Sequence, residues 1–207
     1  MINFLFLIYE LLSLFLYPLL IIYIQYRKTK GKESEERIRE KFGIASVLRP
    51  KGFLLWFHAA SVGETIAIIP LIEKIKSQFS SINILLTTGT ITSAEIVKTR
   101  LGEKVIHQFI PIDSVIPVKR FLNYWQPNLV IFAESEIWPI IIKKVSKKAK
   151  VILVNARMSP RSFKKWNNFK YIAKNLLNYF TLILAESKAS YNHFKELGAD
   201  KNMILMG

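Results

Sequence analysis

Residues 53–64, with the sequence FLLWFHAASVGE, pass from a short apolar run to small residues and then to a carboxylate. The run at 53–58 predicts a buried β-strand, and residues 62–79 predict the helix that follows it. Ser61 and Glu64 have the spacing of a capping box, in which the serine caps the helix and the glutamate bonds back to the turn. The stretch therefore predicts a strand, a turn and a helix, with a carboxylate at the start of the helix.

The same alternation of apolar runs and helical stretches continues along the chain. Further strands are predicted at residues 82–88, 105–110, 129–133, 151–154 and 182–185, and further helices at 93–101, 115–124, 137–145, 160–178 and 188–197. The apolar runs are short, continuous and rich in Ile, Leu, Val and Phe, which is typical of parallel strands that are covered on both faces. The fold class predicted from this pattern is α/β, with an open, doubly wound parallel sheet.

The N-terminal segment differs in composition from the rest of the chain. Residues 2–26 form an apolar run that is long enough to cross a bilayer, with Glu10 as its one charge. Basic residues follow at once, and by the positive-inside rule they place the rest of the chain in the cytoplasm. We therefore predict a membrane anchor at residues 1–26. Glu10 and Pro18 also fit the alternative of a helix that lies in the membrane interface.

A charged stretch separates this segment from the first strand. Within it, residues 33–42 (ESEERIREKF) predict a helix that stops at Gly43. The predicted organisation is therefore an anchor, a basic helical connector at residues 27–50, and a single α/β domain at residues 51–207.

The composition favours some binding partners and excludes some kinds of reaction and metal site. Thirty Lys and Arg stand against 15 Asp and Glu, and the resulting net charge of +15 favours anionic partners: a phosphorylated substrate, an anionic bilayer or nucleic acid. The chain has no cysteine, which excludes disulfides, thiolate metal sites and cysteine nucleophiles. The three histidines are far apart and match no zinc motif. No nucleic-acid-binding motif is visible, so a nucleic-acid partner is not expected.

In doubly wound sheets, ligands bind where loops leave the carboxyl ends of the strands. The first such loop carries Glu64, which has two interpretations. As the third helical residue of a capping box, it stabilises the start of the helix. At the same position, the helix dipole keeps a carboxylate ionised, as a general base requires at neutral pH. The similar spacing of Thr92 and Glu95 predicts a cap alone.

After the strand at 129–133 come Glu134, Ser135 and Glu136. Two carboxylates that leave a buried strand cost free energy unless they are used or paired. One of them is suited to cap the next helix, and a divalent metal site is conceivable. The Asp-x-Asp pattern of metal-dependent sugar-nucleotide transferases is absent from the sequence. We therefore favour an acid/base or electrostatic role over a metal site.

After the following strand come Asn155 and Arg157. An arginine suits bidentate binding of carboxylate or phosphate, and the alternative is a salt bridge to Glu134 or Glu136. The next helix begins with interleaved basic and aromatic residues, 161–171, which suit either anionic headgroups or a solvated face. No glycine-rich phosphate loop is present, so the sequence does not predict a nucleotide held by backbone amides here.

Taken in order, these loops resemble those of a known family. The segments are HAASVGE at 58–64, TTGTITS at 87–93, LVIFAESEIWP at 129–139 and VNARMSPRS at 154–162. Behind an apolar N-terminal segment and a basic stretch, this ordered set resembles the N-terminal, acceptor-binding half of bacterial 3-deoxy-D-manno-octulosonic acid (Kdo) transferases. The resemblance covers nearly the whole chain.

The resemblance implies a GT-B architecture, in which two Rossmann-like domains face each other and the N-terminal one binds the acceptor. It implies transfer of Kdo from CMP-Kdo to lipid IVA at the cytoplasmic face of the inner membrane, with no metal or other cofactor. In that scheme Glu64 is the general base, and Glu134 stabilises the transition state. The further substrate-binding residues expected at this edge are Ser61, Gly63, Thr88, Glu136, Asn155 and Arg157.

The chain stops at Met206 and Gly207, where the family continues into a donor-binding domain. We therefore expect that these residues alone do not turn over CMP-Kdo, and that a separate C-terminal donor domain is a candidate partner. The other expected partners are lipid IVA, whose phosphates suit the basic charge, and the anionic surface of the inner membrane. The rival hypothesis is a truncated, non-catalytic, membrane-anchored domain that binds anionic lipid or a partner chain.

Overall fold

The computed structural model describes residues 2–134, 137–199 and 202–206. The helices are α1 (Ile2–Phe15), α2 (Tyr17–Thr29), α3 (Val62–Gln78), α4 (Ile91–Leu101), α5 (Val115–Trp125), α6 (Pro139–Val145), α7 (Pro160–Asn167), α8 (Lys170–Leu177) and α9 (Lys188–Glu196), with 3-10 helices at Ile38–Phe42 and Gly102–Lys104. The strands are β1 (Leu54–Ala59), β2 (Asn83–Thr88), β3 (Ile106–Phe109), β4 (Leu129–Ala133), β5 (Lys150–Ala156), β6 (Leu182–Ala185) and β7 (Met203–Leu205).

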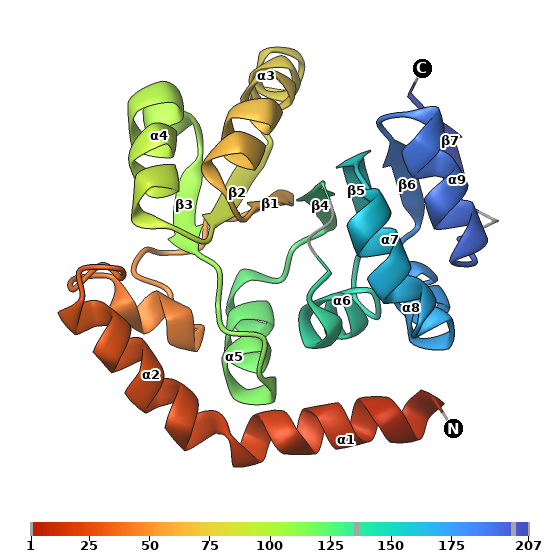
Figure 1. Cartoon of the computed structure of the whole chain (residues 1–207). Helices are drawn as coiled ribbons and strands as arrows, with labels where there is room; N and C mark the ends of the chain where they lie inside the picture. The colour runs from red at the N-terminus through yellow and green to blue at the C-terminus, as the bar shows by residue number, and fades with distance from the viewer. Residues whose placement is uncertain (1, 135–136, 200–201, 207) are drawn as a thin grey trace.

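Within the described residues, seven parallel strands form one sheet in the order β3-β2-β1-β4-β5-β6-β7. The chain first winds from β1 out to β3, and then returns to place β4 on the other side of β1 (Figure 1). The winding direction therefore reverses between β1 and β4, and ligands of such sheets bind at this switch point. The prediction of an α/β fold with a doubly wound parallel sheet is confirmed.

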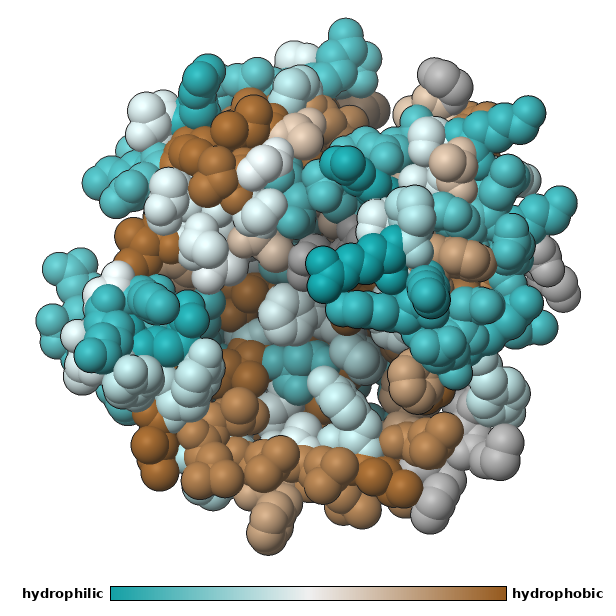
Figure 2. Space-filling view, in the orientation of Figure 1, coloured by the Kyte–Doolittle hydropathy of each residue, from teal (hydrophilic) through white to brown (hydrophobic). Residues whose placement is uncertain are grey.

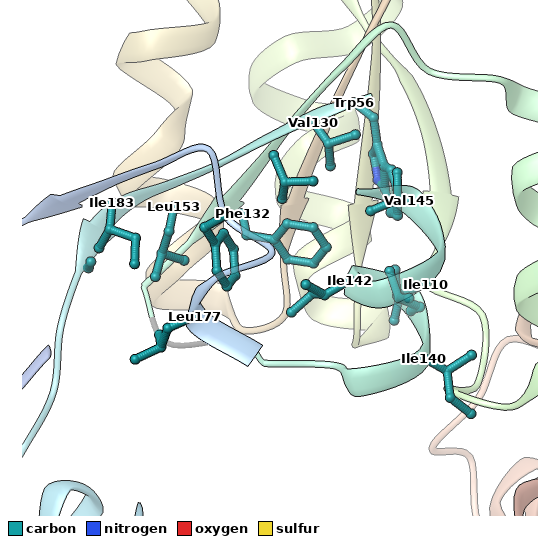
Figure 3. Packing of buried hydrophobic residues seen from close by; sticks show 14 of the residues in the cluster. Trp56, Ile110, Val130, Phe132, Ile140, Ile142, Val145, Leu153, Leu177 and Ile183 are labelled. Atoms are coloured by element: carbon teal, nitrogen blue, oxygen red, sulfur yellow. The ribbon is translucent and has the colours of Figure 1, made fainter. Parts of the chain in front are cut away.

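The central strands β2, β1, β4 and β5 contribute to two hydrophobic cores, because alternate side chains face opposite sides of the sheet. In β1, Leu54 and Trp56 belong to one cluster, and Leu55 and Phe57 belong to the other. The first cluster joins the sheet to α5, α6, α8 and α9, and Figure 3 shows part of it; the second joins the sheet to α3 and α4. Since both faces of the central strands are covered, their sequences are continuously apolar rather than alternating.

Two stretches between the strands differ from the prediction. The helix predicted at 160–178 is two helices, α7 and α8, because Phe169 has a non-helical backbone between them. The helix predicted at 33–42 is a 3-10 helix at Ile38–Phe42. There, Glu33 and Glu40 are drawn into buried ion pairs instead of facing solvent. Tertiary contacts override local helix propensity at this position.

Gly43 ends the 3-10 helix as predicted, in the left-handed conformation with φ of 75°. A Cβ atom added here would lie 2.0 Å from the carbonyl oxygen of Pro117 in α5. The position therefore requires glycine for its backbone angle and for the close approach of α5.

The N-terminal apolar run forms two helices rather than one, and its role as a membrane anchor stays a prediction. α1 and α2 meet at 57°, and among the described residues no single helix has both the length and the apolar character needed to cross a bilayer. The bent pair meets both requirements when its two helices are taken together. Pro18 in the first turn of α2 explains the break, because proline has no N–H to bond to the preceding turn.

One face of α1 is bonded to the α/β domain. The Tyr9 hydroxyl donates to Asp113 Oδ2 over 3.3 Å, and Ser114 Oγ donates to the carbonyl oxygen of Ser13 over 3.0 Å. Glu10 pairs with Lys143 Nζ at 3.1 Å. The opposite face is exposed and apolar, and Figure 2 shows it as a brown band along the lower edge of the molecule, where Figure 1 places α1. The N-terminal run is therefore a docked pair of helices with an uncovered apolar side.

Candidate active site

Two glutamates flank the switch point of the sheet. Glu64 is the third residue of α3, which follows β1, and Glu134 comes directly after the last residue of β4. Because β1 and β4 are paired, parallel strands, their carboxyl ends lie at the same edge of the sheet. Burial is the largest cause that raises the pKa of Glu134, and the negative charge of Glu64 raises it further, so the two carboxylates interact electrostatically. The fold thus brings together the two residues that the sequence singled out.

Glu64 forms the predicted capping box. Its backbone N–H donates to Ser61 Oγ over 3.3 Å, while Ser61 Oγ donates to Glu64 Oε1 over 2.8 Å. The backbone N–H of Ala60 donates to Glu64 Oε2, also over 2.8 Å. The glutamate is only 6% exposed. Its carboxylate is therefore held in one orientation at the start of α3.

This capping role leaves the Glu64 carboxylate able to accept a further proton. An ionised carboxylate offers about four lone-pair positions, two on each oxygen. The two hydrogen bonds from Ser61 and Ala60 use one position on each oxygen. Capping and proton abstraction are therefore compatible in one side chain, provided that the substrate hydroxyl reaches the small exposed part of the carboxylate.

Glu134 is positioned by an unusual backbone rather than by a cap. Its φ is 55°, in the left-handed region that residues other than glycine seldom adopt. Its backbone N–H donates to the carbonyl oxygen of Val154 in β5 over 2.9 Å, which fixes the end of β4 against its neighbour. Such strained residues cluster at functional sites, since the surrounding structure must compensate for them. The strained position ends β4 at the same edge of the sheet at which α3 begins.

The surroundings of Glu134 raise its pKa above the ordinary value. Partial burial is the largest cause, the charge of Glu64 is the second, and Glu186 adds to both. The guanidinium of Arg157 acts in the opposite direction and favours the ionised form. Four ionisable side chains from the ends of β1, β4, β5 and β6 thus influence one another at this edge.

Arg157 lies at the rim of this group. It is paired with Glu186, which follows β6, with Nε 3.5 Å from Oε1. The side chain of Arg157 remains 64% exposed, so its guanidinium is available to an anionic ligand. Asn155 is also exposed, at φ of 51°, before the chain enters the loop that carries Arg157. The sequence did not single out Glu186, although the rule that selected the other loops applies equally to the loop after β6.

The first and second loops of this edge are packed against each other. The Gly89 N–H donates to the carbonyl oxygen of Ala60 over 3.1 Å, and a Cβ atom on Gly89 would lie 2.6 Å from that oxygen. Lys41 Nζ donates to the carbonyl oxygen of Gly89 over 3.0 Å. In contrast, Ser61 and Gly63 are exposed, and a Cβ atom on Gly63 would meet only Ser61 Oγ, at 4.0 Å. The space above the start of α3 is therefore open.

Thr88 and two histidines are structural residues within the sheet. Thr88 is fully buried, and its hydroxyl is hydrogen-bonded to His107 Nε2 at 2.9 Å. The prediction that Thr88 binds substrate is not supported, because its side chain has no exposed surface with which to contact a ligand. Burial lowers the pKa of both His58 and His107 to about 3, so each imidazole is neutral.

The remaining site predictions concern Glu136 and a metal. Glu136 lies outside the described residues. Among residues 2–134, 137–199 and 202–206, no three His, Asp or Glu side chains are grouped in a way that would hold a metal ion.

Comparison with known proteins gives a consistent result. A sequence model of the family described as 3-deoxy-D-manno-octulosonic-acid transferase (kdotransferase) matches residues 36–207. The chain is similar to the 3-deoxy-D-manno-octulosonic acid transferase of Rickettsia bellii, with 39% identity over 191 residues that cover 92% of this chain and 46% of the relative.

Two further relatives come from distant organisms. The chain is 38% identical over 200 residues to the probable mitochondrial 3-deoxy-D-manno-octulosonic acid transferase of Arabidopsis thaliana, covering 95% of this chain and 45% of the relative. It is 32% identical over 200 residues to the 3-deoxy-D-manno-octulosonic acid transferase of Haemophilus influenzae, covering 95% of this chain and 46% of the relative. The chain thus spans about half the length of the relatives that it matches.

Proposed function

The chain belongs to the Kdo transferase family, and from this premise we propose that it is the acceptor-binding half of a glycosyltransferase. The reaction is transfer of Kdo from CMP-Kdo to lipid IVA in lipopolysaccharide biosynthesis. The observation that carries the proposal is the pair of interacting carboxylates, Glu64 and Glu134, at the switch point of the sheet. The architecture is one half of a GT-B enzyme, in which the donor nucleotide binds on a second Rossmann-like domain.

Glu64 is the general base of this proposal. An acceptor hydroxyl donates its proton to a free lone pair of the carboxylate, its oxygen forms the new bond to Kdo, and the bond to the CMP phosphate breaks. A general base acts when its oxygen lies about 2.6–3.2 Å from the oxygen that carries the proton. The hydrogen bonds from Ser61 and Ala60 support this role, because they hold the carboxylate in one orientation before the substrate arrives.

Glu134 stabilises the transition state. Transfer of a sugar proceeds through an oxocarbenium-like state, and a nearby carboxylate lowers the free energy of the positive charge that develops there. This role requires the ionised form of Glu134, which Arg157 favours against the opposing effects of burial and of Glu64. Ser61, Gly63, Asn155 and Arg157 form the rim at which the sugar and its phosphates bind. No metal or other cofactor takes part.

The N-terminal helices hold this domain at the cytoplasmic face of the inner membrane. The exposed side of α1 and α2 is apolar, with Phe15 80% and Ile22 64% exposed, and basic residues follow at the end of α2. Helices with an apolar side and flanking cations bind in the interface of anionic membranes. The net charge of +15 favours both the membrane surface and a phosphorylated acceptor.

The test uses Glu64→Gln in the full-length protein, with Kdo transfer from CMP-Kdo to lipid IVA as the readout. Removing a general base lowers the rate by about 10²–10⁴-fold. The matched control is Glu95→Gln, an exposed glutamate in α4, and this variant retains the wild-type rate. Wild-type transfer by Glu64→Gln contradicts the proposal.

The same experiment separates the rival function. A non-catalytic, membrane-anchored domain that binds lipid or a partner chain is favoured by the uncovered apolar side of α1 and α2. If that is the whole function, the full-length wild type shows no transfer, whereas binding to vesicles of anionic phospholipid is the same for the wild type and Glu64→Gln.

A further inference from the structure

An apolar cavity of about 270 Å³ lies between the N-terminal helix and the α/β domain. Residues of α1, among them Phe6, Ile8 and Tyr9, form one wall. Pro139 at the start of α6 and Ile172 of α8 belong to the opposite wall. Tyr9 alone among its described lining residues carries a polar side-chain atom, and that hydroxyl donates to Asp113. The cavity therefore offers a ligand only apolar contacts.

The wall formed by α1 is held firmly in place. Beside the bond from Tyr9 to Asp113, Glu10 pairs with Lys143 at 3.1 Å and with Lys144 at 3.8 Å. Asp113 in turn accepts the backbone N–H groups of Ile140 and Ile141 at the start of α6. These polar contacts of α1 fix its position against the α/β domain. They therefore set the distance between the two walls of the cavity.

The size and lining of the cavity indicate its occupant. A cavity without polar partners does not hold water well, and an apolar cavity of about 150 Å³ already accommodates a benzene molecule. A cavity of about 270 Å³ therefore takes a larger apolar group. The α1 wall also belongs to the helix whose outer side is exposed and apolar, with Leu11 55% exposed. A chain entering from a bilayer would meet a continuous apolar path.

Cations lie beside this cavity. Lys143 Nζ is 4.9 Å from the centre of the Phe6 ring, which lines the cavity. Glu10 and Asp113 balance the charges of Lys143 and Lys144 here, so the positive charge without a counterion lies on the α8 side of the cavity. Lys170 and Lys174, on α8 to either side of Ile172, are both exposed. An apolar cavity beside cations suits a ligand that combines an acyl chain with an anionic headgroup.

The cavity is also close to the carboxylate pair along the chain. Pro139 lies five residues after Glu134. Five fully extended residues reach at most about 18 Å, so the two residues are no farther apart than that. The ring of Trp138, the residue before α6, lies 6.1 Å from that of His58 in β1, so α6 begins beside the sheet. A short stretch of chain therefore links the Pro139 wall of the cavity to the end of β4.

We propose that this cavity binds one fatty acyl chain of the phosphorylated glycolipid acceptor, an inference that rests on the proposed function. Insertion of the chain positions the headgroup at the carboxylate pair and distinguishes an acylated acceptor from a free phosphosugar. The residues that line the cavity are binding residues, and they take no part in the transfer of the proton.

The test uses photolabelling of the whole chain in vesicles of phosphatidylethanolamine and phosphatidylglycerol. The probe is lipid IVA with a diazirine at the end of one acyl chain, and peptide mass spectrometry locates the label. We expect the label in α1 and in α8 around Ile172. Ile172→Trp and Ile8→Trp, which fill the cavity from opposite walls, lower this labelling at least tenfold. The matched control, Leu19→Trp at an exposed position of α2, leaves it unchanged.

Two outcomes overturn the proposal: labelling that neither cavity-filling variant reduces, and equal labelling of the cavity by phosphatidylglycerol with the same diazirine chain. The proposed function is tested by a separate measurement, which is Kdo transfer by the full-length protein. If the cavity is an acyl site, Ile172→Trp raises the KM for lipid IVA and leaves kcat unchanged. If only the cavity proposal is wrong, that KM stays at the wild-type value while Glu64→Gln still abolishes transfer.

Discussion

Glu64 and Glu134 occupy neighbouring turns at one edge of the sheet, yet the structure positions them by different means. Glu64 is buried, and both of its carboxylate oxygens accept hydrogen bonds from its own turn. Glu134 is placed by a left-handed backbone at the end of β4 and has a raised pKa. The comparison teaches that orientation and ionisation are controlled separately here. Hydrogen bonds fix the orientation of Glu64, whereas burial and then neighbouring charges set the pKa of Glu134.

The largest effect that tests this difference is expected from Glu134→Gln in the full-length protein. We expect kcat to fall about 10²-fold, because an electrostatic contact to the transition state is lost. Burial and the charge of Glu64 raise the pKa of Glu134, so the wild-type rate falls on the acid side at a higher pH than an ordinary glutamate would give. The variant loses the contribution of Glu134 to this acid limb, whereas protonation of the base Glu64 still lowers its rate at acid pH. A pH–rate profile measures kcat and the position of the acid limb together, and an acid limb that is unchanged in the variant contradicts the assignment.

Asp113 extends the comparison to a third carboxylate, which is held like Glu64 by backbone N–H groups. Its Oδ1 accepts the N–H of Ile141 over 2.8 Å, and burial raises its pKa from 3.8 to about 6. Because the folded state holds this proton more tightly than the unfolded state, stability is lost as the pH rises from about 4 to about 6. The loss amounts to about 3 kcal/mol.

Asp113→Asn tests this sign, with urea unfolding at several pH values as the measurement. The variant is less stable throughout, since an amide oxygen replaces two acceptors, but its free energy of unfolding changes less between pH 4 and pH 6. A wild-type protein that gains stability as the pH rises across this interval would show that Asp113 is stabilised as an anion.

The contact between the loop after β1 and the loop after β2 predicts a smaller effect, on the free energy of unfolding. Two glycines of these loops, Gly89 and Gly63, serve as test and control. Gly89→Ala forces a methyl group to within 2.6 Å of the Ala60 carbonyl oxygen, and we expect a loss of about 1–3 kcal/mol in the free energy of unfolding. Gly63→Ala meets only Ser61 Oγ at 4.0 Å, so its stability stays within about 1 kcal/mol of the wild type. Equal losses in the two variants would show that contact with Ala60 does not decide the position of the turn.

The smallest effect is expected from Ser61→Ala, which separates the cap from the base. Loss of an N-cap hydroxyl lowers the free energy of unfolding by about 0.5–2 kcal/mol. The Ala60 N–H still bonds to Glu64 Oε2, so the orientation of the carboxylate is largely kept. We expect Kdo transfer to fall by less than about tenfold, consistent with a lost contact of about 1 kcal/mol. A loss as large as that of Glu64→Gln would assign the chemistry to the serine.

The elements that depend on neighbouring residues were predictable from the sequence. The apolar run and capping spacing around Glu64 defined β1, the turn and α3, because strand burial and helix capping depend on neighbouring residues. The cap of α4 was misplaced for an equally local reason. Thr90, with its extended backbone, accepts the N–H of Ser93, whereas Thr92 already lies within the helix.

Contacts between distant parts of the chain were not predictable from periodicity. Tyr9 and Asp113 are 104 residues apart, and their hydrogen bond holds α1 against the α/β domain. Glu186 joins the candidate site through the position of β6 beside β5, and its local sequence carries no distinguishing motif. Thr88 was expected to bind substrate at the end of β2, but its side chain is buried and hydrogen-bonded to His107 in β3.

A double-mutant cycle tests most directly the claim that Glu64 and Glu134 act on one reaction. Kdo transfer is measured for the full-length wild type, for Glu64→Gln, for Glu134→Gln and for the double variant. Residues that act together in one transition state are strongly non-additive. We predict that the double variant is no more than about tenfold slower than the slower single variant. A double variant whose loss equals the product of the two single losses would contradict the account.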